Sequence, residues 1–255
     1  MKAITVCVNY DDLLAITLPR NAAHFEEVMV VTSPEDHKTR RVVWEVQNAF
    51  CYVTNAFTLH GASFNKGYAL ELAFDVLGRN GWIAVIDADT LLPDDMHIHN
   101  LQPTCLYSAP RRILRDPKQW SPAFDWSSAP ILPVRPNLFP GYFHLFHAFD
   151  PALQPLPWYD VTLAHAGGGD GFFQSRWPKE RKVWLPFEVL HLGVCDCNWY
   201  GRTTQRLSGE PPQFSPEKMM GLYDLWRTRR NAPAHERYGD RVDVPGHHPR
   251  PWVYE

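Results

Sequence analysis

Apolar runs alternate with segments of helical period over the first hundred residues. Runs rich in β-branched and aromatic residues predict strands over 3–8, 28–32, 50–53 and 82–86. Helical spacing predicts a helix over 13–25, which Pro19 would kink or split. A second helix is predicted after Asn65 as N-cap, with Leu70, Phe74 and Leu77 on its apolar face. This alternation predicts an α/β fold with a mostly parallel sheet flanked by helices.

The second half of the chain lacks this clear period. Residues 101–160 hold eleven of the 23 prolines, interleaved with aromatic residues, and one predicted strand over 141–148. We expect this proline-rich segment to form a long, structured excursion across the face of the sheet. A polar region begins near 215, with a predicted helix over 217–230 and an extended arm after it. No repeat or linker divides the chain, so we expect one domain over 1–255, built from 1–100, 101–214 and 215–255.

Composition narrows the class of protein. Hydrophobic residues make up 45% and charged residues 21% of the 255 residues, as in globular proteins that bury a core without disulfides. The net charge of −3 disfavours a broad nucleic-acid-binding surface. The five cysteines have no disulfide-framework spacing, and no run of about 18 apolar residues predicts a transmembrane helix. The N-terminal apolar run is too short for a signal peptide. We expect a cytoplasmic protein.

The strongest chemical signal is the sequence Asp87-Ala88-Asp89, directly after the buried strand predicted over 82–86. Ligands of open parallel sheets bind beyond the carboxyl ends of the strands. Residues i and i+2 of an extended segment point to one side, so both carboxylates can face one ligand. A divalent cation would relieve their repulsion and bind a diphosphate. The alternative is a surface turn with two solvated acids.

This motif and its neighbours resemble the nucleotide-sugar half of the GT-A glycosyltransferases, and are most similar to the family-2-like branch. The resemblance covers about 1–100 and parts of 160–202. It is carried by Gly61-Ala62-Ser63-Phe64-Asn65-Lys66-Gly67, by Ala69 and Ala73, and by Trp82-Ile83-Ala84-Val85-Ile86-Asp87-Ala88-Asp89. It implies a Rossmann-like GT-A fold, a nucleoside-diphosphate sugar as donor (a UDP-sugar is favoured), and Mn²⁺ or Mg²⁺.

The resemblance also implies roles for individual residues. Asn9, Tyr10 and Asp36 would hold the nucleoside, whereas Asn65 and Lys66 would approach the phosphates or the sugar. Asp87 and Asp89 would hold the metal ion on the diphosphate. Lys66 also has independent physical support, because a cation at a helix start is unfavourable for the helix dipole unless an anion binds there. The alternative for Lys66 is a solvated surface lysine.

A glycine-rich stretch in the second half suggests the acceptor side. Residues 166–173 read Ala-Gly-Gly-Gly-Asp-Gly-Phe-Phe, in which glycines such as Gly168 and Gly169 let a substrate approach the backbone closely. The stretch resembles the acidic motif of inverting GT-A enzymes, which makes Asp170 the candidate general base. The relatives often carry two adjacent acids there, whereas this chain has one. The alternative is a hairpin or loop turn.

Three further positions complete the candidate site. The resemblance to GT-A enzymes, many of which have a late histidine as a metal ligand, implies that His191 is a third ligand favouring Mn²⁺, although a lone histidine in an apolar run is more often a core residue. Arg202 would pair with the diphosphate and Trp199 would stack on a sugar, with ordinary packing as the alternative for both. Cys195 and Cys197 could instead bind zinc with His191.

Together these residues predict a metal-dependent glycosyltransferase that transfers a sugar to an acceptor hydroxyl, with inversion if Asp170 is the base. Three alternatives remain. The acceptor could be a hydroxymethylated base of phage DNA. The chain could be a nucleotidyltransferase, although these enzymes normally carry a Gly-rich basic signature where this chain has Asn9-Tyr10-Asp11-Asp12. It could also be a non-catalytic module that binds sugars or nucleotide sugars. The sugar, the acceptor and the oligomeric state are open.

Overall fold

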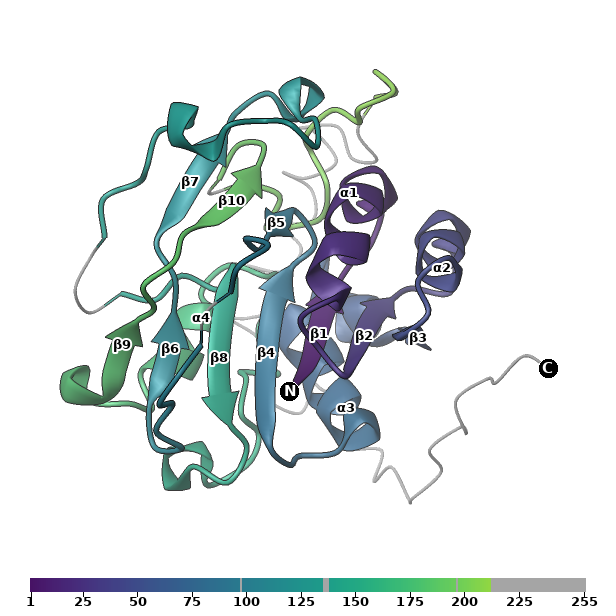
Figure 1. The fold of residues 1–255 in the computed structure, drawn as a ribbon. Helices are drawn as coiled ribbons and strands as arrows, with labels where there is room; N and C mark the ends of the chain where they lie inside the picture. Colours follow the sequence, from purple (N-terminus) through teal and green to yellow (C-terminus); the bar gives the residue numbers. More distant parts are fainter. Residues whose placement is uncertain (97, 135–137, 196, 212–255) are drawn as a thin grey trace.

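The computed structural model describes residues 1–96, 98–134, 138–195 and 197–211 (Figure 1). The predicted helix over 217–230 and the arm after it lie outside these residues. The strands are β1 (Lys2–Val6), β2 (Glu27–Thr32), β3 (Ala49–Val53), β4 (Trp82–Asp87), β5 (Thr90–Leu91), β6 (Leu106–Ser108), β7 (Arg111–Leu114), β8 (Phe143–His147), β9 (Lys182–Trp184) and β10 (Val189–Leu192). The helices are α1 (Asp11–Ala22), α2 (His37–Trp44), α3 (Lys66–Leu77) and α4 (Gly169–Gln174), with 3₁₀ turns at Ala56–Gly61, Pro117–Gln119, Trp126–Ser128, Pro151–Leu153 and Lys179–Arg181.

A seven-stranded sheet in the order β3-β2-β1-β4-β8-β6-β9 forms the centre of the molecule. Strands β1 to β4 are parallel, β6 and β9 are parallel to each other, and β8 runs antiparallel to both of its neighbours. The sheet is therefore mostly parallel, as the alternation of strand and helix patterns predicted. A three-stranded sheet, β5-β10-β7, lies beyond the end of β4 (Figure 1).

Helices cover both faces of the main sheet because its central strands are apolar on both faces. Ile4 and Val85 pack with the apolar face of α3, where Leu70 and Phe74 are fully buried. Ala84, on the other face, packs with residues of α1 and α2 in a second cluster. The carboxyl ends of β1 to β4 point to the same edge, and this common edge is where the candidate residues gather.

Several boundaries differ from the sequence prediction. Helix α1 is not split at Pro19, because the proline lies in the last turn of the helix. Proline has no backbone N–H to donate to the carbonyl of Ala15, but Ala15 is exposed and its carbonyl can bond to water instead. Helix α2 was not predicted; its N-cap is Asp36, whose side chain accepts a hydrogen bond from the backbone of Thr39 at 3.1 Å. The proline-rich segment contributes β6, β7 and β8, of which β6 and β8 extend the main sheet. None of the described helices is long and apolar enough to cross a bilayer.

Helix α3 packs so closely on the segment before α4 that residue 67 has no room for a side chain. A Cβ atom at Gly67 would overlap the backbone oxygen of Asp160 and lie 3.0 Å from its carbonyl carbon. We therefore expect Gly67→Ala to lower the free energy of unfolding by about 1–3 kcal/mol, because backbone atoms have to shift. Chemical denaturation measures this change. Gly171→Ala, which places the same methyl group with no atom within 4 Å, is the control. Equal stability of Gly67→Ala and the wild type would contradict this packing.

Candidate functional site

Residues from eight segments line a cavity of about 410 Å³ at the carboxyl edge of the main sheet. Its walls come from the end of β1 and the loop after it, the start of α3, the end of β4, β7, the chain before β8, α4 with the glycines before it, β10, and residues 194–195 and 197–199, which follow β10. Among the predicted site residues, the cavity contains Tyr10, Lys66, Asp87, Asp89, Gly168, Asp170, His191 and Trp199. Eight predicted residues that are far apart in the sequence therefore meet around one space.

Lys66 and Arg111 are the lysine and arginine that line this cavity, and Lys66 contacts one of its acids. Lys66 is the first residue of α3, and its Nζ atom lies 2.6 Å from Oδ1 of Asp87. Its side chain is only 13% exposed. Burial alone would lower the pKa of Lys66, but the charges of Asp87 and Asp170 outweigh burial and raise it. Lys66 is therefore protonated and balances the surrounding carboxylates.

The register of the small sheet brings His191 to Asp89. His191 of β10 pairs with Thr90 of β5, and Nε2 of His191 lies 3.7 Å from Oδ1 of Asp89. Burial raises the pKa of Asp89, and the charge of Asp87 adds to this effect, whereas His191 and Lys66 oppose it. Oδ1 of Asp89 and Nδ1 of His191 are buried and have no hydrogen-bond partner in the structure as described.

Asp89 and His191 fit a divalent cation in part. The unsatisfied Oδ1 of Asp89 and Nε2 of His191 lie close enough to reach one ion, whereas the unsatisfied nitrogen of His191 is Nδ1, the other ring nitrogen. Asp87, however, is engaged by Lys66, and the described residues contain no group of three His, Cys, Asp or Glu side chains arranged to hold a metal. The same finding applies to the zinc alternative with Cys195 and Cys197. Of the predicted metal ligands, Asp89 and His191 lie close together, and Asp87 contacts Lys66.

Asp170 lies in the first turn of α4, so the glycine-rich stretch begins a short helix rather than a hairpin. Gly168 precedes this helix with a left-handed backbone, φ 89°, and lines the cavity, whereas Gly169 is buried. Trp199 is 47% exposed, and its backbone oxygen accepts a hydrogen bond from Ala166 at 2.8 Å. Asp170 and Trp199 therefore border the same opening, as an acceptor site would require.

A smaller pocket of about 160 Å³ adjoins the cavity and shares Val8 and Phe64 with it. Asn9 and Asp36, two of the three predicted nucleoside contacts, line this pocket. The backbone N–H of Asn9, at φ 62°, donates to Oδ2 of Asp36 at 2.6 Å. Tyr10, the third, lies in the larger cavity instead. The other residues that line the pocket include the aromatic Phe57 and Phe64 and the polar Ser33, Glu35, Thr54, Asn55, Thr58 and Ser63.

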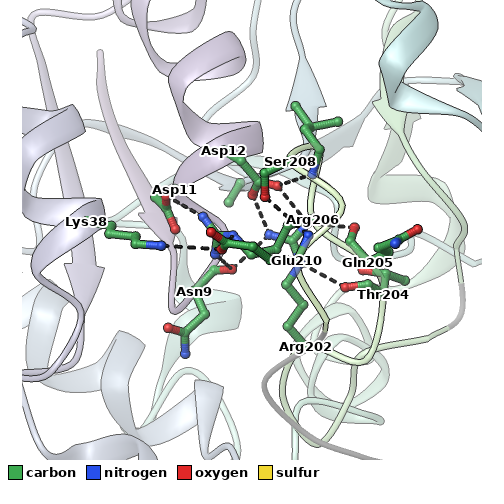
Figure 2. A network of polar contacts seen from close by, with 12 residues as sticks. Asn9, Asp11, Asp12, Lys38, Arg202, Thr204, Gln205, Arg206, Ser208 and Glu210 are labelled. Atoms are coloured by element: carbon green, nitrogen blue, oxygen red, sulfur yellow. Dashed lines mark hydrogen bonds and ion pairs between the residues drawn. The ribbon is translucent and has the colours of Figure 1, made fainter.

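Arg202 does not have the role that the sequence predicted for it. All five N–H groups of its guanidinium are used within the protein, and the side chain is 2% exposed. It forms a bidentate ion pair with Asp12, and it donates to the backbone oxygens of Asn9 at 2.8 Å, Thr204 at 3.2 Å and Gln205 at 3.1 Å (Figure 2). Its guanidinium also lies 4.7 Å from the centroid of the Tyr10 ring. No N–H group remains for a phosphate, so Arg202 fixes the loop after β1.

Asn65 is likewise occupied. Its Oδ1 atom caps α3 by accepting a hydrogen bond from the backbone of Tyr68 at 2.9 Å, which confirms the predicted N-cap. Its Nδ2 group donates to the backbone oxygen of Val161 at 2.8 Å. The side chain is buried and does not line the cavity. Asn65 therefore positions Lys66 instead of presenting its own amide to a ligand.

A second arginine extends the Arg202 contact into a network that sequence reasoning missed. Arg206 pairs with Asp11 and with Glu210, and Glu210 also lies 3.5 Å from Nζ of Lys38 (Figure 2). The network attaches residues 198–210 to the start of α1. The available signal was the adjacent acid pair Asp11 and Asp12, followed much later by two arginines four residues apart.

Comparisons with known proteins leave the family open. No family model matches the chain, and no curated protein matches it. Among solved structures, a protein described as a glucose-1-phosphate thymidylyltransferase from Bacillus anthracis is 14% identical, over 74% of this chain and 86% of that one, with a TM-score of 0.38. The inositol-1-phosphate CTP transferase from T. maritima is 10% identical over 77% of this chain and 91% of that one, with a TM-score of 0.46. A 4-diphosphocytidyl-2C-methyl-D-erythritolsynthase from Anaerococcus prevotii is 10% identical over 89% of this chain and 97% of that one, with a TM-score of 0.41. Similarity of this strength carries no argument about activity.

The ion pair between Arg202 and Asp12 makes stability depend on pH. Burial by itself would raise the pKa of Asp12, but hydrogen bonds from Arg202 and from the backbone of Leu207 lower it. The ionised carboxylate therefore stabilises the fold above its ordinary pKa of about 3.9, and this stabilisation is lost as the pH falls below that value. Arg202→Ala should lower the free energy of unfolding by about 3–5 kcal/mol at neutral pH. The further decrease of this free energy at acidic pH should be smaller in the variant than in the wild type.

Denaturation of the wild type and Arg202→Ala between about pH 3 and pH 7 measures both effects. Lys38→Ala, which removes an exposed ion pair with Glu210, is the control and should change stability by less than about 1 kcal/mol. An equally steep acid dependence in Arg202→Ala and the wild type would contradict the assignment.

Proposed function

We propose that this chain is a glycosyltransferase of the GT-A type, which transfers a sugar from a nucleoside-diphosphate sugar to an acceptor hydroxyl. One observation carries the proposal. A buried lysine, two acids at the end of β4, a histidine and a further acid from α4 line the same cavity, and a smaller pocket adjoins it. The cavity thus contains groups suited to a diphosphate and, in Asp170, a candidate general base.

The donor would lie across the two spaces. Its base and ribose would occupy the pocket lined by Asn9 and Asp36, with Phe57 or Phe64 against a flat ring. Its diphosphate would then reach the larger cavity beside Lys66, because both spaces share Val8 and Phe64. The ammonium group of Lys66 would bind phosphate oxygens and offset the negative charge that develops on the leaving diphosphate.

A divalent cation, Mn²⁺ or Mg²⁺, would be held by the unsatisfied Oδ1 of Asp89 and by Nε2 of His191, which lies 3.7 Å from it. When bound, it would supply further charge stabilisation for the diphosphate. Asp87 would orient Lys66 through their 2.6 Å contact, and it could contribute its second oxygen to the site.

Asp170 would act as the general base. Its carboxylate lines the cavity, and none of the described residues donates a hydrogen bond to it, so its lone pairs are available for the proton of an acceptor hydroxyl. The hydroxyl oxygen would then attack the anomeric carbon as the bond to the diphosphate breaks. In-line attack inverts the configuration. Trp199, at the mouth of the cavity, offers an aromatic face to the acceptor.

A nucleotidyltransferase is the principal alternative, and the reaction products separate it from the proposal. A nucleotidyltransferase would release pyrophosphate from a nucleoside triphosphate, whereas a glycosyltransferase releases a nucleoside diphosphate from a nucleotide sugar. The loop after β1 favours the second reaction, because it carries no basic residue for a triphosphate, and Arg202 and Arg206 pair with Asp12 and Asp11 at the start of α1. A binding module would give neither product.

The first test is a screen of nucleotide sugars with Mn²⁺, in which release of nucleoside diphosphate is measured. Asp170→Asn should lower kcat about 10²–10⁴-fold, because the amide cannot accept the proton, while the KM for the donor stays close to that of the wild type. Thermal stabilisation by the donor shows that the variant still binds it. Transfer at the wild-type rate by Asp170→Asn would remove the base assignment. Pyrophosphate release from a triphosphate would replace the proposed function.

The second test concerns the metal ligands. Asp89→Ala should weaken the binding of Mn²⁺ at least tenfold, because the ion loses its carboxylate ligand. The electron paramagnetic resonance signal of free Mn²⁺ measures this affinity without any substrate. Asp94→Ala is the matched control, because Asp94 is an exposed carboxylate paired with Arg20. Equal Mn²⁺ affinity of Asp89→Ala and the wild type would contradict the assignment.

A further inference from the structure

The carboxylate of Asp170 occupies the space in which residue 141 would have a side chain. A Cβ atom built on Gly141 would overlap both carboxylate oxygens and the Cγ atom of Asp170. The carboxylate is therefore packed against the bare α-carbon of Gly141. These two residues come from different elements, since Gly141 precedes β8 and Asp170 lies in α4.

The backbone of Gly141 does not itself require a glycine. Seven other described glycines, among them Gly168, have a left-handed φ that side chains rarely adopt, whereas Gly141 is outside this group. An alanine at 141 would thus meet no backbone strain of this kind. The space needed by the Asp170 carboxylate is what excludes a side chain there.

No polar contact competes with this packing as a constraint on Asp170. In the part of the chain that the structure describes, no residue donates a hydrogen bond to its carboxylate, and Lys66 is bonded to Asp87. Lys66 and His144 lie within electrostatic range of Asp170, but such interactions fix no orientation. Steric contact with Gly141 therefore decides where the carboxylate lies.

The segments on the two sides of the contact are held too firmly to separate. The backbone N–H of Phe139 donates to Oε1 of Gln174 in α4 at 2.7 Å, which connects the chain before Gly141 to the helix of Asp170. Tyr142, on the other side, accepts a hydrogen bond from the backbone of Asp87 at 3.0 Å. Phe173 is fully buried and stacks on Tyr159, with 4.3 Å between the ring centroids, which anchors α4. A side chain at 141 would therefore be accommodated mainly by rotation of Asp170.

We infer that Gly141 is a positioning residue for Asp170: its missing side chain creates the notch that holds the carboxylate toward the cavity. The role in catalysis rests on the proposed function, because Gly141 acts there only through the base. The contact itself does not depend on that function. Each part has its own measurement.

The contact is tested by stability. Gly141→Ala should lower the melting temperature by about 1–3 °C, because Asp170 has to rotate out of the space that the methyl group takes and a flexible side chain can rotate at a small cost. In the Asp170→Ala background the same substitution should cost less than about 1 °C, since the notch is then empty. If Gly141→Ala costs the same in both backgrounds, or nothing in either, the inference is wrong. Should Gly141→Ala fail to fold alone, folding of the double variant would support the inference.

The role in catalysis is tested by kinetics with the donor identified in the screen. Gly141→Ala should lower kcat at least tenfold and leave the KM for the donor within about twofold, because the displaced base no longer meets the acceptor. Added to Asp170→Asn, it should lower kcat no further. Independent, additive losses in the double variant would overturn the positioning role. A wild type that transfers no sugar would instead remove the proposed function and leave the stability result standing.

Discussion

Carboxylates crowd the carboxyl edge of the main sheet, and their mutual repulsion has to be balanced by cations. Two unit charges about 4 Å apart interact by about 4 kcal/mol at the effective dielectric typical of a protein surface, so an unbalanced group of acids would open the fold. Each surrounding element supplies a part of the balance. Helix α3 begins with Lys66, although a cation is unfavourable at that end of a helix. Residues 198–210 bring Arg202 and Arg206 to the acids at the start of α1. The acids that remain toward the cavity are the ones we propose for binding and catalysis.

The first half of the fold could be predicted because local signals agree with the tertiary structure there. The strand over 82–86 is apolar on both faces and lies beside β1 in the middle of the sheet. Asn65 was identified as an N-cap, and its side chain does cap α3. The proline-rich segment was harder, because β6 and β7 are only three and four residues long. Their pairing depends on partners distant in the sequence, which no local period can indicate.

The site was predictable only as far as its residues carry their own chemical signal. Asp87, Asp89 and Asp170 were found because acids beside a strand end or among glycines are conspicuous, and the structure places all three around one cavity. Arg202 was assigned to the diphosphate because a free arginine would suit it, but its five N–H groups are used inside the protein. Gly141 gave no signal at all. Gly141 matters because it has no side chain, and this can be recognised only from the structure, in which the Asp170 carboxylate occupies the space of a Cβ atom at 141.

The most direct test of this account is an experimental structure of the protein with a nucleoside diphosphate and Mn²⁺ bound. The account predicts that the nucleobase lies in the smaller pocket, between Asn9, Asp36 and the aromatic residues. It also predicts that the phosphates lie beside Lys66 and that the metal ion lies beside Asp89. The carboxylate of Asp170 should remain against Gly141, and the diphosphate should lie between this carboxylate and the nucleobase. A nucleotide bound elsewhere, or phosphates that lie along the loop after β1 and away from Lys66, would contradict the central claim.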